Sequence, residues 1–267
     1  MPVFVLLVGI IIATGRKLDR SPHEIAGAGP QVTKSNRTEP LSSIRLEAPV
    51  SVEVVDGPEW KYTITGCGNR LDLIRIDVSD GELRIATTEP GTRFRKDEPA
   101  RITVTAPRPL NAVDVFRMGI LRMSRPTVTA AFSLNASRQG RVHISQLGTA
   151  KLKVRISGKG RAAIGDMRSD DLAVETDGNA RFSAEGRTVR LKARVSGRSK
   201  LDPSDMKVSE AKCVVSGMSL ARVDNLPQCE RPELSRLVYS SRLGDRPEER
   251  SDISTVNAYL PPAVRIG

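Results

Sequence analysis

The sequence predicts an all-β protein whose central part is a right-handed parallel β-helix-like solenoid, preceded by a strand-rich N-terminal segment. Three observations support this prediction. A short phrase recurs about every 20 residues, hydrophobic and polar residues alternate before each copy, and aromatic residues make up only 3% of the 267-residue chain. A fixed period near 20 residues is typical of solenoids. A narrow solenoid core is filled by small and branched side chains, so the scarcity of aromatic residues agrees with it.

The recurring phrase is a short strand followed by a Ser-Gly-type corner. Its corner glycines are Gly158, Gly178, Gly197 and Gly217. Glycine reaches a positive φ without a Cβ penalty, and a preceding serine hydrogen-bonds nearby backbone, so the pair turns the chain sharply. A weaker copy has Arg138 at the corner, and we expect a degenerate first copy around Gly119.

Each copy has room for strands and turns only. Leu152, Val154 and Ile156 alternate with lysine and arginine, which is the period-2 pattern of a half-buried strand. A second short strand follows each corner, and a polar return such as Gly165-Asp166 closes the coil. Equivalent strands of successive coils are therefore expected to stack in parallel, about 4.8 Å apart.

Composition divides the chain into five parts. Residues 1–15 hold an apolar run that is too short for a membrane span of about 20 residues, and they predict a signal peptide or an N-terminal anchor. Residues 16–40 are rich in Gly, Pro, Ser and charge and predict a linker. Residues 41–109 predict the strand-rich segment, and residues 110–229 the coils. Residues 230–267 predict a capping or disordered tail.

The apolar run and the cysteines bear on the location of the protein. The run predicts export to the periplasm, the outer membrane or the cell surface. Cys67, Cys213 and Cys229 have no CxxC spacing, so they predict neither a metal site nor a redox motif. Cys213 aligns with valine and alanine residues of other copies, which favours burial in the core. A disulfide between Cys213 and Cys229 that closes the last coil is the open alternative.

The strand pattern and the repeated phrase together resemble the GIN-domain family, the putative auto-transporter adhesin head domain. The resemblance rests on alternating strands around Asp80-Gly81 and on the phrase Ser157-Gly158-Lys159-Gly160, and it spans residues 41–229. The chain departs from the pattern where Arg138 replaces a corner glycine. The resemblance implies an exported, mostly β, right-handed helix-like structure with no established enzymatic activity.

Cations beside the corners form the candidate binding site. The net charge of +11 at pH 7 favours anionic partners. Stacked coils would place Arg161, Arg181 and Lys200 in one column without an acidic residue to relieve their repulsion. The predicted stripe consists of Lys159, Arg161, Arg181, Arg198 and Lys200. It would bind an anionic polysaccharide, lipopolysaccharide or lipid headgroups, unless it is only a solvated face that deters aggregation.

Other function classes are less well supported by the residues. Few aromatic residues flank the stripe, so nucleic acid is not an expected partner. No catalytic, metal or cofactor motif occurs, and we predict neither enzymatic activity nor a cofactor.

Two further hypotheses stay open. A β-helix polysaccharide lyase or hydrolase would need two carboxylates on adjacent coils. Its candidates are Asp166, Asp170, Asp171 and Asp177. Their places in corners and returns favour turn formation instead. A passive structural or assembly module would pair an open end of the stack with a partner strand.

Overall fold

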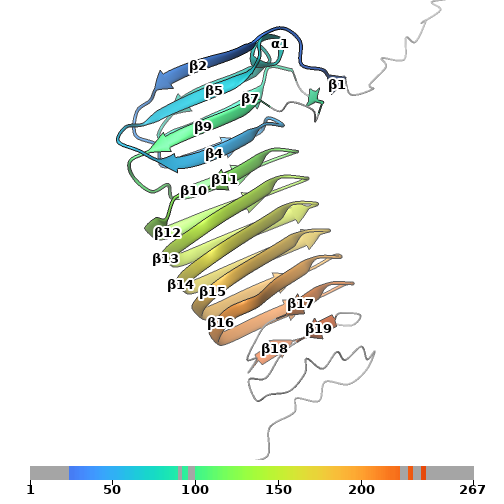
Figure 1. The fold of residues 1–267 in the computed structure, drawn as a ribbon. Helices are drawn as coiled ribbons and strands as arrows, with labels where there is room; N and C mark the ends of the chain where they lie inside the picture. Colours follow the sequence, from blue (N-terminus) through green and yellow to red (C-terminus); the bar gives the residue numbers. More distant parts are fainter. Residues whose placement is uncertain (1–23, 90–91, 96–99, 223–227, 231–235, 239–267) are drawn as a thin grey trace, which may run out of the picture.

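The computed structural model describes residues 24–89, 92–95, 100–222, 228–230 and 236–238. These residues form one long stack of strands, with the short helix α1 (Gly68–Leu71) near its N-terminal end (Figure 1). A single sheet contains 17 of the strands, and β1 (Glu24–Ile25) pairs with β8 (Arg93–Phe94) apart from it. The prediction of an all-β solenoid is confirmed.

Five strands build the central coils, and each pairs in parallel with the next. They are β12 (Thr127–Ala136), β13 (Arg141–Gly158), β14 (Arg161–Gly178), β15 (Arg181–Val195) and β16 (Lys200–Val215). Because β13 covers 18 residues of a repeat of about 20, one such strand follows nearly a whole coil. Each coil is therefore one rung of the stack (Figure 1).

The core is a narrow column of aliphatic side chains inside the rungs. Leu152, Val154 and Ile156 are buried, as their alternation predicts, and Phe182 is among the largest fully buried side chains. Cys213 is also buried, as predicted. Strand β18 (Gln228–Glu230) places Cys229 in register with Cys213. The side chain of Cys229 lies outside the described residues, so the disulfide stays a prediction.

The predicted glycine corners lie in one file along the stack. Gly158, Gly178, Gly197 and Gly217 all have positive φ, between 67° and 82°. A Cβ on Gly178 would lie 2.9 Å from the carbonyl oxygen of Gly158, and a Cβ on Gly197 would lie 2.7 Å from that of Gly178. Glycine is thus required twice, by the backbone conformation and by the close approach of the neighbouring rung.

Two arginines continue this file upstream of the glycines. Arg117 and Arg138 have φ of 55° and 59°. The N–H of Gln139 donates to the carbonyl oxygen of Arg117 at 2.8 Å, and the N–H of Lys159 donates to that of Arg138 at 2.5 Å. A left-handed conformation costs a non-glycine residue about 1–2 kcal/mol. Both arginines therefore adopt the left-handed backbone conformation of the corner glycines, although it is unfavourable for a residue with a Cβ.

The first corner is consequently Arg117, and the prediction that placed it at Gly119 is wrong. Gly119 accepts the N–H of Arg141 at 2.9 Å, as Gly140 accepts the N–H of Arg161 on the next rung. Gly119 therefore occupies the position two residues after the corner. The prediction located corners by their glycine residues, so it could not identify a corner that is occupied by arginine.

The N-terminal part stacks out of chain order. Six strands form its rungs: β3 (Ser43–Leu46), β4 (Ser51–Asp56), β7 (Glu82–Thr87), β9 (Arg101–Ala106), β10 (Ala112–Val115) and β11 (Ile120–Met123). Strands β3 and β4 pair in parallel with β10 and β11 on one side and with β7 and β9 on the other. The coils therefore begin well before residue 110, and the predicted boundary there does not separate two structures.

The N-terminal end of the stack is antiparallel. Strand β2 (Gln31–Arg37) pairs with β5 (Lys61–Cys67), which pairs with β9, and β6 (Ile74–Ser79) pairs with β7. Asp80 and Gly81 form the hairpin turn between β6 and β7, with φ of 52° and 73°. Positive φ at both central residues is the type I′ requirement.

The linker predicted for residues 16–40 is wrong for β2. Apart from Val32, which packs against the core, this strand is polar, and its pairing with β5 includes hydroxyl contacts such as Thr33 to Thr65 at 3.0 Å. A strand without hydrophobic alternation gives no period-2 signal.

The C-terminal boundary of the coils also differs from the prediction. Strand β17 (Leu220–Arg222) pairs with β16, and β19 (Arg236–Val238) pairs with β17, so the stack continues past residue 229. The predicted signal peptide or anchor and the tail after residue 238 lie outside the described residues. In the part of the chain that the structure describes, no helix has the length and apolarity that a membrane crossing requires.

Candidate functional site

The predicted cations Arg161, Arg181 and Lys200 are register partners on three adjacent strands. The structure adds Arg141, which pairs with Arg161 and lies at the same position of its coil. The three arginines are exposed and Lys200 is half-buried. We call Arg141, Arg161, Arg181 and Lys200 the corner file. The repeat spacing of 20 residues before Arg161 is the signal that could have revealed Arg141.

The repulsion within the corner file is relieved at one end only. Lys200 Nζ lies 2.7 Å from Asp202 Oδ2 on the same strand, so the prediction of a column without acidic relief is wrong for Lys200. Arg141, Arg161 and Arg181 form no ion pair within the described residues. Outside the corner file, Arg155 does have an acidic partner, because its Nε lies 2.9 Å from a carboxylate oxygen of Glu175.

Lys159 and Arg198 lie beside the corner file but not on each other. Each directly follows a corner glycine and is exposed. The N–H of Asn179 donates to Gly158 and that of Arg198 to Gly178, both at 2.6 Å, so Asn179 occupies the rung between the two cations. Of the five predicted stripe residues, only Arg161, Arg181 and Lys200 are therefore register partners on adjacent rungs.

A second row of cations was missed by the sequence analysis. Arg168, Arg187 and Lys207 are exposed register partners on β14, β15 and β16. Together with the exposed Val128 and Val189 they line a hollow of about 670 Å³. We call the three cations the groove file. They repeat with the coil period, but each strand pair has a register shift between the corner and these cations. Their distance from the corner therefore varies along the sequence, and aligning the repeats on their corners does not align the three cations.

Two of the predicted acidic candidates, Asp171 and Asp177, are held by local partners. Arg190 donates to both carboxylate oxygens of Asp171, at 2.5 and 2.8 Å. These hydrogen bonds hold the pKa of Asp171 below its ordinary value. Asp177 accepts the hydroxyl of Ser196 at 2.9 Å.

Acidic residues do share one register file on adjacent coils, Asp166 with Glu185 and Glu185 with Asp205. Asp166, which accepts the amide of Gln146 at 3.1 Å, is the register partner of the exposed Glu185. Neither of them lines the hollow beside the groove file. Among the described residues, no group of three or more His, Cys, Asp or Glu side chains could hold a metal ion. Of the four predicted acidic candidates, Asp170 alone lines the hollow beside the groove file, so no two of these four carboxylates converge there.

The family model described as putative auto-transporter adhesin, head GIN domain, matches residues 40–225. The chain belongs to this family. The match covers both the out-of-order N-terminal rungs and the regular coils, so the GIN domain includes more than the glycine repeats. No curated protein matches the sequence of this GIN-domain protein.

Solved structures resemble the GIN-domain fold described above. A putative lipid binding protein from Parabacteroides distasonis has a TM-score of 0.69 at 17% identity, covering 82% of this chain and 95% of that chain. A putative adhesin from Parabacteroides merdae has a TM-score of 0.67 at 16% identity, covering 82% of this chain and 95% of that chain. At such identities the likeness concerns the fold alone.

Proposed function

We propose that this GIN-domain protein is an exported, non-enzymatic, adhesin-like protein that binds an anionic polysaccharide along the corner file. The observation that carries the proposal is the register of Arg141, Arg161, Arg181 and Lys200, which sets four cations on four adjacent rungs. Like charges at a spacing of about 5 Å repel by about 1 kcal/mol even in water. A bound polyanion would remove this repulsion.

The repeating geometry favours a polymer over a small ligand. Each surface contact between a cation and an anionic group is weak, but contacts along one rigid face add up once the first has formed. The family description and the neighbours named as putative adhesins support a role at the cell surface or envelope. A neighbour named a putative lipid binding protein makes lipopolysaccharide and lipid headgroups the second class of anion to test.

The test removes three charges from the corner file by Arg141→Ser, Arg161→Ser and Arg181→Ser. Lys200 stays in place because it holds Asp202. The matched control removes three charges from another face. It consists of Lys153→Ser, Lys192→Ser and Lys212→Ser, all at exposed positions. Binding is measured to dextran sulfate, to neutral dextran and to lipopolysaccharide, each at low and high salt.

We expect the wild-type protein to bind dextran sulfate at low salt and to release it at high salt, because salt screens exposed charges. The corner-file variant should lose at least about tenfold in affinity, whereas the lysine control should lose less than about threefold. Both variants should melt close to the wild-type temperature. Equal losses in the two variants, or no binding of any polyanion by the wild type, would contradict the proposal.

The same samples test the two rival hypotheses. A lyase or hydrolase would shorten an anionic polysaccharide during incubation, which gel filtration of the polymer detects. A passive assembly module would form oligomers whose size does not respond to dextran sulfate, which sedimentation velocity detects.

A further inference from the structure

A hollow of about 380 Å³ lies where the out-of-order N-terminal rungs meet the regular coils. Four arginines, Arg45, Arg84, Arg117 and Arg138, line it together with Glu47 and Phe116. The register of β7, β3 and β10 puts Arg84 and Arg45 on neighbouring rungs, and Arg117 and Arg138 follow on the next two. Four successive rungs thus each contribute one guanidinium. We call this site the arginine hollow.

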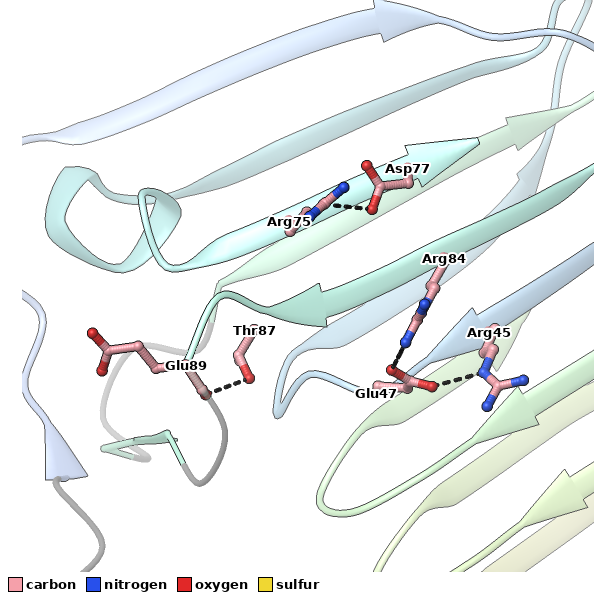
Figure 2. Close-up of polar contacts among 7 residues, drawn as sticks. All are labelled: Arg45, Glu47, Arg75, Asp77, Arg84, Thr87 and Glu89. Carbon is pink, nitrogen blue, oxygen red and sulfur yellow. Dashed lines mark hydrogen bonds and ion pairs between the residues drawn. The ribbon is translucent and has the colours of Figure 1, made fainter. Parts of the chain in front are cut away.

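One half of the arginine hollow is held by Glu47 (Figure 2). Arg45 Nε donates to one oxygen of Glu47 at 2.7 Å, and Arg84 Nη2 donates to the other at 2.9 Å. The Arg45 guanidinium also lies 5.1 Å from the centre of the Phe116 ring. Burial raises the pKa of Glu47, but the hydrogen bonds and charges of the two arginines outweigh it and lower the pKa overall. The carboxylate stays charged at neutral pH and fixes both side chains.

The other half has cations without such a partner. Arg117 and Arg138 form no ion pair within the described part of the chain, and Arg138 is exposed. Both keep a positive φ at corners where the next four rungs have glycine. A side chain retained at a strained backbone position points to a use for that side chain. Here the side chain retained is an arginine on each of two neighbouring rungs.

The charge and geometry of the site identify the ligand class. Four guanidinium groups and one carboxylate leave three positive charges around the hollow. The planar guanidinium group of arginine matches the oxygens of a phosphate group. Phe116 offers an apolar surface for the organic group that is esterified to the phosphate. We propose that the arginine hollow binds a phosphate monoester. Arg117 and Arg138 donate to the phosphate oxygens, and Glu47 positions Arg45 and Arg84 around them.

This site is separate from the corner file, so the two proposals fail independently. The decisive variant is Arg117→Gly with Arg138→Gly, because glycine occupies this corner position on each of the following four rungs. Calorimetry at low salt measures binding of inorganic phosphate, glucose 6-phosphate and glucose. The control variant carries Arg141→Ser and Arg161→Ser, which removes the same charge from the corner file.

We expect the wild-type protein to bind both phosphates but not glucose. The glycine variant should bind glucose 6-phosphate at least about tenfold more weakly, since it loses two charge-assisted contacts. It should melt no lower than the wild type and bind dextran sulfate unchanged. The control should keep phosphate affinity within about threefold. Wild-type affinity in the glycine variant, or no phosphate binding by the wild-type protein, would overturn the proposal.

Two sources of phosphate monoester are separated by a sedimentation assay. Vesicles of phosphatidylcholine with phosphatidate are compared with vesicles of phosphatidylcholine alone. Phosphatidate-dependent sedimentation that the glycine variant abolishes assigns the site to a lipid headgroup. Binding of glucose 6-phosphate without such sedimentation assigns it to a phosphorylated sugar.

Discussion

Arg138 and Gly158 hold the same left-handed corner on adjacent rungs, with φ of 59° and 67°. The N–H of Lys159 donates to the carbonyl oxygen of Arg138 at 2.5 Å, and the N–H of Asn179 donates to that of Gly158 at 2.6 Å. The backbone therefore follows one path whichever residue occupies the corner. The stacking of the rungs fixes this path, and the residue type changes only the free energy of following it.

Replacing Arg138 by glycine should stabilise the protein. The change removes about 1–2 kcal/mol of left-handed strain and adds about 0.5–1 kcal/mol of backbone entropy in the unfolded chain. We expect a net gain of about 0.5–1 kcal/mol in the free energy of unfolding, measured with urea. Arg138→Ala is the control, because it keeps a Cβ in the left-handed conformation and should bring no gain. A loss of stability in Arg138→Gly would show that the arginine side chain itself supports the fold.

Replacing Gly178 by alanine should be strongly destabilising. Its φ is 82°, and the new Cβ would lie 2.9 Å from the Gly158 carbonyl oxygen and 3.1 Å from its Cα. Backbone strain and overpacking together should lower the free energy of unfolding by about 2–4 kcal/mol. Ala173→Ser on the outer face of the same strand should change it by less than about 0.5 kcal/mol. Chemical denaturation of both variants tests whether the corner tolerates a side chain.

Replacing Phe182 by alanine should open a cavity in the middle of the stack. The side chain is only 1% exposed, and truncation of a buried phenylalanine costs about 3–5 kcal/mol. Met218→Ala is a useful control because Met218 is 62% exposed, and its truncation should cost less than about 0.5 kcal/mol. Similar losses in the two variants would contradict the assignment of the core.

The arginine pair on Glu47 should make stability fall at acidic pH. The folded-state pKa of Glu47 is lowered, so its contribution is complete above the ordinary glutamate value of about 4.3. It is lost as the pH falls through the lowered folded-state value, because the unfolded chain then binds the proton more readily. Glu47→Gln should therefore show a flatter decline of melting temperature between about pH 5 and pH 3. Superimposable pH curves of wild type and Glu47→Gln would refute this contribution.

Much of the regular coil was predictable because its constraints are local. Gly158 and Gly178 mark corners that only glycine follows without strain, and Leu152 and Val154 alternate with charged residues over a few positions. The same spacing placed Arg161 over Arg181, since equivalent positions of a repeat must stack. The corner file could therefore be identified before the structure, apart from Arg141 and the ion pair at Lys200.

The arginine hollow could not be predicted, because it depends on contacts between segments far apart in the chain. Arg84 and Arg45 are neighbours only because β7 stacks on β3, which reverses the chain order. Arg117 carries no repeat signal, since it keeps the glycine conformation without being glycine. Such pairings depend on the hydrophobic surface that the N-terminal strands bury against one another, and no local sequence pattern records it.

The sequence by itself determined the coil, its period and the row of cations beside its corners. Each repeat contains a corner residue and a strand of alternating hydrophobic and polar residues, and both signals are local. The tertiary structure alone decided where the stack begins, which strands close its N-terminal end and which arginines meet around Glu47. These features depend on non-local strand pairing. The free energy of such pairing comes from burying side chains of distant segments together, and no short window of sequence contains both partners.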